Sequence, residues 1–344
     1  MIFLDGSHGE GGGGLIRAAL SMAALTQQSV KIANIRQGTS FPGVDVEDYL
    51  LAKSLAAICQ AETPGLEIGA ETLTFHPTCR PRPFKGALEF PVSPRSPNAL
   101  VLLSTLAPIV ARAGAMSSLY MKGETYGANS LTFDYFQRVG LRALSAVGIY
   151  ATPELHRAGY GREKPGEVSL EVEPSELRGA VWEDRGSLKE CGATVTTSRL
   201  PDAVIARGVS HLRRMAGVQG IPLSVEVNDV PADQPGAFVT CWTIYQNGAG
   251  GATAMGTRGL RIEHLAQQAF EGLVRWMETD ATVDPYLADQ LLIPAAFAES
   301  NTVFKTPRLT KRFLTAVWVL KQFIPIHIVV KGKEDEPGLV TIRR

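Results

Sequence analysis

The sequence has little of what a disulfide framework, a zinc centre or a membrane anchor requires. It contains four cysteines in 344 residues, all far apart and none in a C-x-x-C pair, so neither a disulfide framework nor a zinc site is expected. No apolar run is long enough to span a bilayer, since residues 99–110 are interrupted by Ser, Thr and Pro. The N-terminus also lacks the apolar core of a signal peptide. We therefore expect a cytoplasmic protein without a membrane partner.

The chain also lacks an excess of charge of either sign. Lys plus Arg number 34 and Asp plus Glu number 34, so the formal net charge is zero at pH 7. This balance does not indicate a general nucleic-acid binder, and we expect no DNA partner. A polyanion would have to be held by a local cluster, or only by a short end of it. Apolar residues make up 45% of the chain, which is enough to form the core of one large or two moderate domains.

Glycine, by contrast, is concentrated near the N-terminus. Six of the nine residues 6–14 are Gly, in a loop between an expected strand, Ile2–Asp5, and an expected apolar helix at residues 15–27. Because glycine has no side chain, the backbone N–H groups of Gly11, Gly12 and Gly13 are accessible at a helix N-terminus, where the helix dipole favours an anion.

One acid and one base accompany this glycine-rich loop. Glu10 lies within it and Arg17 lies on the first helical turns, a combination that suits a phosphate with a divalent metal. The alternative is an ordinary glycine-rich turn that binds nothing. The loop lacks the Gly-Lys-Ser/Thr ending of a P-loop and the G-x-G-x-x-G spacing with an acidic partner. Both interpretations stay open at this point.

Two further positions are candidates for ligand contacts. Tyr286, Asp289 and Gln290 follow an Asp-Pro helix start, and their spacing allows all three to share one helix face. The alternative is a capped helix with a solvated Asp and a packed Tyr. Arg36 lies at a strand end beside a turn, where α/β proteins place ligand contacts, although a surface arginine is the commoner case. The six histidines show no metal-ligand spacing.

Strands and amphipathic helices alternate along the chain, which predicts an α/β fold. Further helices are expected at residues 46–60, 99–113, 133–147, 202–215, 262–279, 286–299 and 309–323. Further strands are expected at residues 30–35, 73–76, 87–92, 118–122, 168–172, 193–198, 223–227, 238–245, 326–330 and 339–342. A change of pattern predicts a smaller inserted α/β domain at residues 181–278 within a larger domain made of residues 1–180 and 279–344; the alternative is one continuous sheet.

Several separated motifs together resemble the RNA 3′-terminal phosphate cyclase family. They occur in the family's order over almost the whole chain: Leu4-Asp5-Gly6-x-x-Gly9-Glu10-Gly-Gly-Gly with Arg17, Ile35-Arg36-x-Gly38 with Pro42-Gly43, Gly123-x-Thr125 before Asp134 and Arg138-Val139, and Tyr286-Leu-Ala-Asp-Gln-Leu. The resemblance implies an α+β arrangement with a large domain of three repeated α/β units. Each unit would have a two-helix layer and a four-stranded-sheet layer, similar to units in the enolpyruvyl transferases. A smaller α/β domain would be inserted before the last unit.

The resemblance also implies an activity and the roles of the candidate residues. Members of the family are ligases that use ATP to convert an RNA 3′-phosphate to a 2′,3′-cyclic phosphate through an enzyme–AMP intermediate on a histidine. Glu10 would then hold Mg²⁺ or Mn²⁺ on the triphosphate, and Arg17 and Arg36 would neutralise phosphate charge. Tyr286 would be a platform for adenine, with Asp289 and Gln290 near the nucleotide. An RNA 3′ end and a nucleotide are the implied partners, and a homo-oligomer is left open.

The chain departs from the family at the position of the nucleophile. Arg312 stands where the family has its histidine, and an arginine is always protonated and cannot attack. Lys311 is a replacement nucleophile only if its pKa is lowered. Glu47 and Asp48 replace a Gln-His pair and add negative charge where an RNA end would be held.

Three functions follow from these observations. The first is a divergent, active cyclase. The second is a non-catalytic relative that binds a nucleotide or RNA or assists ribosome assembly. The third is a small-molecule transferase of the enolpyruvyl-transferase type, which would require many converging Arg and Lys residues.

Overall fold

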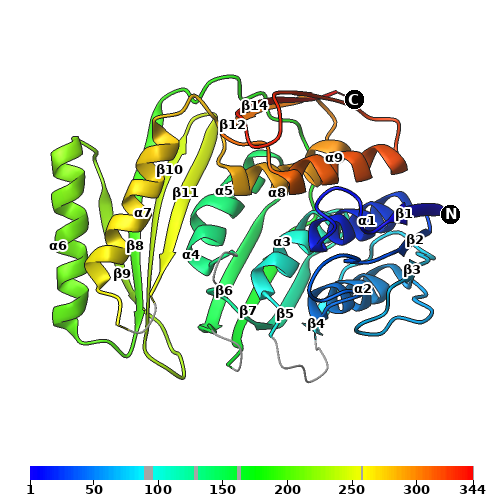
Figure 1. Cartoon of the computed structure of the whole chain (residues 1–344), viewed down its shortest axis with the longest axis horizontal. Coiled ribbons are helices and arrows are strands. Elements are labelled where there is room, and N and C mark those ends of the chain that lie inside the picture. Colours follow the sequence, from blue (N-terminus) through cyan, green and yellow to red (C-terminus); the bar gives the residue numbers. More distant parts are fainter. Residues whose placement is uncertain (89–95, 128–130, 161–163, 257–258, 344) are drawn as a thin grey trace.

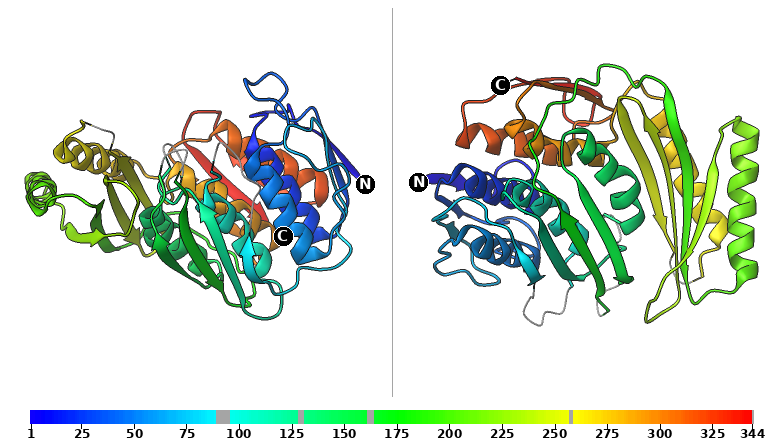
Figure 2. Two further views of the ribbon diagram at one scale, coloured as in Figure 1. Left: turned by 90° about the horizontal axis from the view of Figure 1, so that it is seen from below. Right: turned by 180° about the vertical axis from the view of Figure 1, so that it is seen from behind.

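The computed structural model describes residues 1–88, 96–127, 131–160, 164–256 and 259–343. Three small sheets with paired helices form the larger part of the molecule, and a fourth sheet with two helices projects to one side, at the end opposite the N-terminus (Figures 1 and 2). The predicted mixed α/β class is confirmed. Within the described ranges no helix is long and apolar enough to cross a membrane.

The first unit contains the glycine-rich loop. Its elements are β1 (Ile2–Asp5), α1 (Gly13–Thr26), β2 (Val30–Ala33), α2 (Val46–Cys59) and β3 (Leu73–Phe75). β2 lies in the middle of the sheet, parallel to β1 and antiparallel to β3. The N-cap residue of helix α1 is Gly12, which provides no side-chain cap, and the first turn contains no acid. The N-terminal N–H groups of α1 are therefore not satisfied by a side-chain cap. Helix α2 starts with a capping box between Asp45 and Asp48.

The second unit has a four-stranded sheet in the order β4-β5-β7-β6. Its elements are β4 (Lys85–Leu88), α3 (Ala99–Val110), β5 (Ser117–Gly123), α4 (Phe133–Tyr135), the π-helical turn η1 (Phe136–Gly140), α5 (Leu141–Ala146), β6 (Ala151–Arg157) and β7 (Gly166–Val172). The helix predicted at residues 133–147 is thus interrupted by a π-helical turn. Of the strand predicted at 87–92, residues 89–92 lie outside the described residues. Strand β6 was not predicted.

The third unit follows the projecting part of the chain. Its elements are α8 (Pro285–Phe297), β12 (Thr302–Thr306), α9 (Lys311–Phe323), β13 (His327–Lys331) and β14 (Gly338–Arg343). The prediction of four strands in every unit is corrected here, because the described sheets of the first and third units have three strands each. In the third unit the place beside β12 is taken by a single bridge between Val181 and Val303. One bridge is too short to form a strand.

The projecting part, named here the insert (residues 188–277), has its own apolar core. Its elements are β8 (Leu188–Ser198), α6 (Asp202–Gln219), β9 (Ser224–Asp229), β10 (Gly236–Tyr245), β11 (Gly248–Met255) and α7 (Ile262–Met277), with the sheet order β11-β10-β8-β9. The sheet meets the second unit through Phe238, whose ring stacks on Tyr126 with centroids 4.1 Å apart. Thr196 also donates to the buried Asp134 at 2.8 Å. Strand β11 thereby lies beside the helices of the larger part (Figure 1).

Candidate functional site

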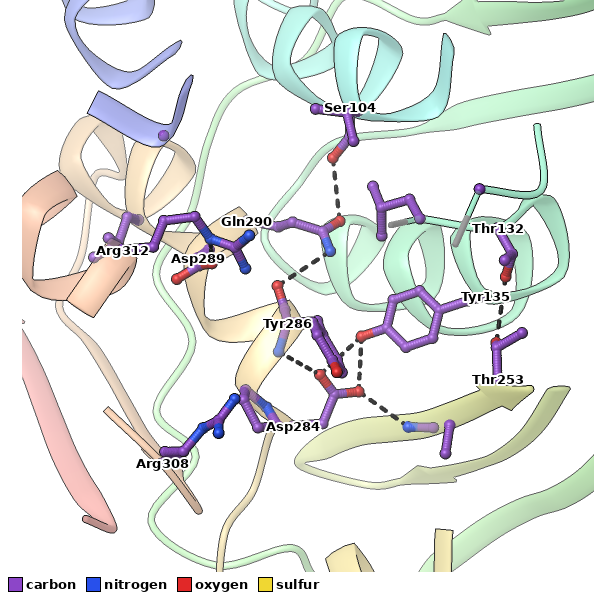
Figure 3. A pocket seen from close by; sticks show the side chains of 18 of the residues that line it. Ser104, Thr132, Tyr135, Thr253, Asp284, Tyr286, Asp289, Gln290, Arg308 and Arg312 are labelled. Atoms are coloured by element: carbon purple, nitrogen blue, oxygen red, sulfur yellow. Dashed lines mark hydrogen bonds and ion pairs between the residues drawn. The ribbon is translucent and has the colours of Figure 1, made fainter. Parts of the chain in front are cut away.

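A pocket of about 1030 Å³ lies between the larger part of the molecule and the insert. Its walls come from α1, α3, α8 and α9 on one side and from β11 and α7 on the other. Figure 3 shows labelled residues of α3, α8, α9 and β11 around it. Five of the candidate residues line it, namely Arg17, Tyr286, Asp289, Gln290 and Arg312. The fold therefore brings together residues that are almost three hundred positions apart in the sequence.

The glycine-rich loop borders this pocket and is fixed to α9. The backbone N–H of Glu10 donates to the Thr315 hydroxyl at 2.9 Å. A Cβ added at Gly14 would lie 2.6 Å from Glu10 Oε2 and 2.7 Å from Arg312 Cγ, so only glycine lets these two side chains meet over the start of α1. The Oε2 atom of Glu10 is buried and has no hydrogen-bond partner among the described residues.

Arg17 and Arg36 approach the same point of α1. A Cβ at Gly13 would lie 2.9 Å from Arg17 Nη1 and 3.1 Å from Arg36 Nη2. Arg17 lines the pocket, with its Nη1 3.8 Å from Glu47 Oε2. Arg36 is instead held by other groups of the protein, and it is not part of the pocket wall.

The partners of Arg36 form a buried ion-pair cluster. Arg36 pairs with Asp48, lies 2.7 Å from Asp45, and donates to the Gly43 carbonyl at 3.0 Å. Burial, reinforced by Asp45, raises the pKa of the Asp48 carboxyl to about 7, although Arg36 opposes this shift. Bonding to Asp48 raises the pKa of Arg36 despite its burial. The sequence did not reveal this cluster, because it depends on how α2 packs behind the turn.

Asp284 organises the N-terminal end of α8. Its carboxylate accepts the backbone N–H groups of Tyr286 and Leu287, both at 2.9 Å. It also accepts the Tyr135 hydroxyl at 2.7 and 2.8 Å and the Gly251 N–H of β11 at 3.0 Å (Figure 3). Burial raises the pKa of Asp284 to about 6, while these bonds act in the opposite direction. The Asp-Pro pair predicted the helix start, but nothing in the sequence predicted the contacts with Tyr135 and Gly251.

Two of the predicted residues on α8 face the pocket in different ways. The Tyr286 side chain is 53% exposed, and its ring packs edge-on against Tyr135 with centroids 6.4 Å apart. This leaves a face of Tyr286 free to stack with a planar group. The Gln290 side chain is fixed by Ser104, at 3.1 Å, and by the Tyr286 carbonyl, at 3.2 Å (Figure 3).

Arg312 forms an ion pair with Asp289 across α8 and α9. Its Nε donates to Asp289 Oδ2, and its guanidinium extends toward Gln290 (Figure 3). Within the described ranges, no hydrogen bond or ion pair involves its two Nη groups. Asp289 Oδ1 is buried without a partner in the same ranges. Burial raises the pKa of Asp289, and Arg312 lowers it. The pair thus offers two N–H-bearing groups to a ligand in the pocket.

Other candidate residues lie away from the pocket wall. Lys311 is exposed at the start of α9 and does not line the pocket. His8 stacks on Trp318 with ring centroids 3.9 Å apart and does not line it either. Arg308, which sequence reasoning missed, is exposed and lines the pocket. No short motif marks Arg308, so only the fold could reveal it.

The described residues contain no group of three or more His, Cys, Asp or Glu side chains that could hold a metal ion. Glu10 supplies one buried carboxylate oxygen without a partner. Mg²⁺ often takes only one or two protein carboxylates and completes its shell with water and substrate phosphates. Glu10 therefore fits a metal that arrives with a phosphate ligand, and does not fit an all-protein metal site.

The fold and the pocket define an α/β protein with a projecting sheet and a cleft lined by several arginines. A family model described as RNA 3′-terminal phosphate cyclase matches residues 8–330. The chain therefore belongs to the RNA 3′-terminal phosphate cyclase family, as its motifs predicted.

Curated relatives with that name are similar over nearly the whole chain. The protein from Methylococcus capsulatus is 31% identical over 99% of this chain and 96% of its own length. The protein from Gloeothece citriformis is 32% identical over 94% of this chain and 93% of its own length. The protein from Archaeoglobus fulgidus is 31% identical over 97% of this chain and 99% of its own length.

Proposed function

We propose that the pocket binds ATP. Tyr286 receives the adenine ring on its exposed face, and Gln290 lies next to it in a fixed orientation. Arg17 and the free Nη groups of Arg312 receive phosphate oxygens, for which the planar guanidinium fork is suited. The uncapped start of α1, with Gly11, Gly12 and Gly13 before and within its first turn, adds N–H groups for an anion.

Glu10 is the residue that would hold Mg²⁺ or Mn²⁺ on the bound triphosphate. Its unpartnered Oε2 supports this role, and a divalent ion there would offset charge between the carboxylate and the phosphates. Arg36 is a weaker candidate for phosphate binding than the sequence suggested. Its guanidinium is already engaged by Asp48, Asp45 and the Gly43 carbonyl.

The second proposed ligand is an RNA 3′-phosphate end. This follows from membership of the family and from the names of the relatives, which are RNA 3′-terminal phosphate cyclases. In the family reaction, ATP drives the conversion of the 3′-phosphate to a 2′,3′-cyclic phosphate. Complete cyclisation by this chain is one candidate activity, favoured by similarity over 99% of its length.

The geometry around Arg312 favours a different outcome for the covalent step. Arg312 is paired with Asp289 and remains protonated, so it cannot attack the α-phosphate of ATP. No histidine is among the described residues that line the pocket, and Lys311 lies outside it. The function supported best is therefore binding of ATP and an RNA 3′ end at a cyclase site that forms no enzyme–AMP adduct. The Arg312–Asp289 pair is the observation that carries this conclusion.

A paired assay tests the proposal. Wild type and Arg312→His are incubated with α-labelled ATP, Mg²⁺ and a 3′-phosphorylated RNA, and both the protein adduct and the cyclic end are measured. Calorimetry with ATP establishes binding independently. We expect ATP binding without an acid-labile adduct in wild type. An adduct in wild type would contradict the proposal, and so would the absence of ATP binding. If wild type cyclises the RNA end but forms no adduct, the chain would catalyse cyclisation without an enzyme–AMP intermediate.

A further inference from the structure

The pocket has basic side chains at two separate places. Arg17 and Arg312 lie at the end formed by α1 and α9, next to the glycine-rich loop. Arg308 and Arg275 line the pocket where the larger part faces α7 of the insert. In Figure 3 both arginines lie to the left of Tyr286, with Arg312 above its level and Arg308 below it. A nucleotide stacked on Tyr286 with its phosphates at Arg17 and Arg312 leaves Arg308 and Arg275 without a role.

Arg308 is positioned for a ligand by a rigid backbone. Its carbonyl accepts the Thr306 hydroxyl at 3.2 Å. The next residue, Leu309, is buried and exchanges backbone hydrogen bonds with the turn before β14, from its N–H to Glu336 O at 2.8 Å and from Asp335 N–H to its own carbonyl at 2.9 Å. The Arg308 side chain is exposed, and its guanidinium has no hydrogen bond or ion pair with any described residue.

Arg275 supplies a second cation on the facing wall. It lies near the end of α7, and its side chain is largely exposed. Its one ion pair in the described ranges is a 3.9 Å contact with Glu271 on the same helix. Such an exposed ion pair contributes little to stability. Arg275 can therefore leave Glu271 and bind a phosphate with only a small loss of free energy.

The opposite approach to the pocket, past α2, is acidic. Glu47 lines the pocket there, and Asp45 and Asp48 stand beside it at the start of α2. Arg36, the cation of this region, is already bound by both aspartates. A phosphodiester chain that passed α2 would meet the exposed carboxylate of Asp45 and that of Glu47 in the pocket wall, and would be repelled by both.

We propose that single-stranded RNA reaches the pocket along the insert, with one backbone phosphate on Arg308 and another on Arg275. This inference rests on the proposed function, because it requires an RNA 3′ end as a ligand. Phosphodiester groups are the chemical class that a pair of exposed, ligand-free arginines in a cleft recognises, irrespective of base sequence. The insert then forms half of the RNA-binding surface, which gives it a role in substrate recognition.

The experiment measures RNA and ATP binding separately. A fluorescent, 3′-phosphorylated single-stranded RNA is titrated by anisotropy between about 50 and 200 mM salt, and ATP is titrated by calorimetry. The variants are Arg308→Ala, Arg275→Ala and Arg308→Lys. Arg213→Ala is the matched control, because Arg213 is an exposed arginine of the insert that does not line the pocket.

We expect Arg308→Ala to weaken RNA binding about tenfold, since it removes a hydrogen bond between charged groups. The slope of log K against log salt should shrink by about 0.7 for each lost phosphate contact. Arg275→Ala should give a smaller loss, Arg308→Lys should keep the salt slope, and Arg213→Ala should change nothing. ATP affinity should stay at the wild-type value throughout.

Two results would overturn the inference. If Arg308→Ala weakens ATP binding and leaves RNA binding unchanged, Arg308 serves the nucleotide. If Arg308→Ala and Arg213→Ala weaken RNA binding equally, the insert contributes only diffuse charge. In both cases ATP binding by wild type still supports the nucleotide half of the proposed function, whereas loss of ATP binding in wild type itself would overturn that half separately.

Discussion

Two arginine–aspartate pairs lie near the start of α1, and they have different consequences. Arg36 pairs with Asp48 and Asp45 and donates to a carbonyl, and its side chain is 11% exposed. Arg312 pairs with Asp289 through Nε alone, and its side chain is 39% exposed. The same two residue types thus form a closed structural cluster in one place and, in the other, an open pair whose guanidinium keeps free N–H groups. The number of free guanidinium N–H groups separates the two cases.

The largest effect is expected for Arg36→Ala, which tests the closed cluster. The change leaves the wholly buried Asp48 carboxylate without its cation, which costs about 3–5 kcal/mol of unfolding free energy. Urea unfolding at about pH 8 measures the loss, because Asp48 is ionised there. The loss of unfolding free energy in Arg36→Ala should be smaller in mildly acidic buffer, where Asp48 is protonated. A loss as small as that of a surface mutation would show that the cluster does not support the fold.

The next prediction concerns the pH dependence of this cluster. Burial and Asp45 raise the pKa of the Asp48 carboxyl from its ordinary acidic value to about 7. The folded protein therefore holds this proton more tightly than the unfolded chain. The resulting stability is complete below the unfolded pKa and is lost as pH rises through about 7. The difference in unfolding free energy between wild type and Asp48→Asn should follow that curve. Asp134 and Asp284 are unchanged in the variant and cancel in the difference.

Arg312→Ala tests the open pair. It should mainly weaken ATP binding, whereas Arg36→Ala should mainly lower the free energy of unfolding. We expect ATP affinity to fall about tenfold, because charge-assisted hydrogen bonds to phosphate are lost. The unfolding free energy should change less than in Arg36→Ala, since Asp289 faces the pocket. Calorimetry with ATP and urea unfolding measure the two effects. Lys311→Ala, at an exposed neighbour outside the pocket, is the control. Equal losses of ATP affinity in Arg312→Ala and Lys311→Ala would show that Arg312 has no specific role in binding ATP.

The smallest effect on the fold is expected for Glu10→Gln. The variant keeps the shape of the side chain, and the unfolding free energy without ligand should stay within about 0.5 kcal/mol of wild type. The increase in ATP affinity on adding Mg²⁺ should disappear, because the amide lacks the charge that holds the ion. ATP titrations with and without Mg²⁺ check this. An undiminished effect of Mg²⁺ would show that Glu10 is not its ligand.

The sequence predicted the elements of this site better than their surroundings. The glycine-rich loop and the helix with Tyr286, Asp289 and Gln290 carry local signals, because turns and helix starts depend on neighbouring residues. The short strands β6 and β12 were missed, since each is defined by its pairing with a partner strand, β7 and β14 respectively, and not by its own residues. The ion pairs that engage Arg36 and the position of Arg308 in the pocket wall also depend on how segments pack in the fold, so the sequence did not predict them.

The carboxylate of Asp284 has a mechanical consequence. It holds the first turn of α8, the hydroxyl of Tyr135 and the backbone of β11 at Gly251. A hinge motion that moved the insert away from the larger part would break the bond to Gly251 and would loosen the anchor of the turn that carries Tyr286. Opening of the cleft would therefore be coupled to the turn that carries Tyr286 through this one carboxylate. Occupancy of the platform would in turn keep the insert docked.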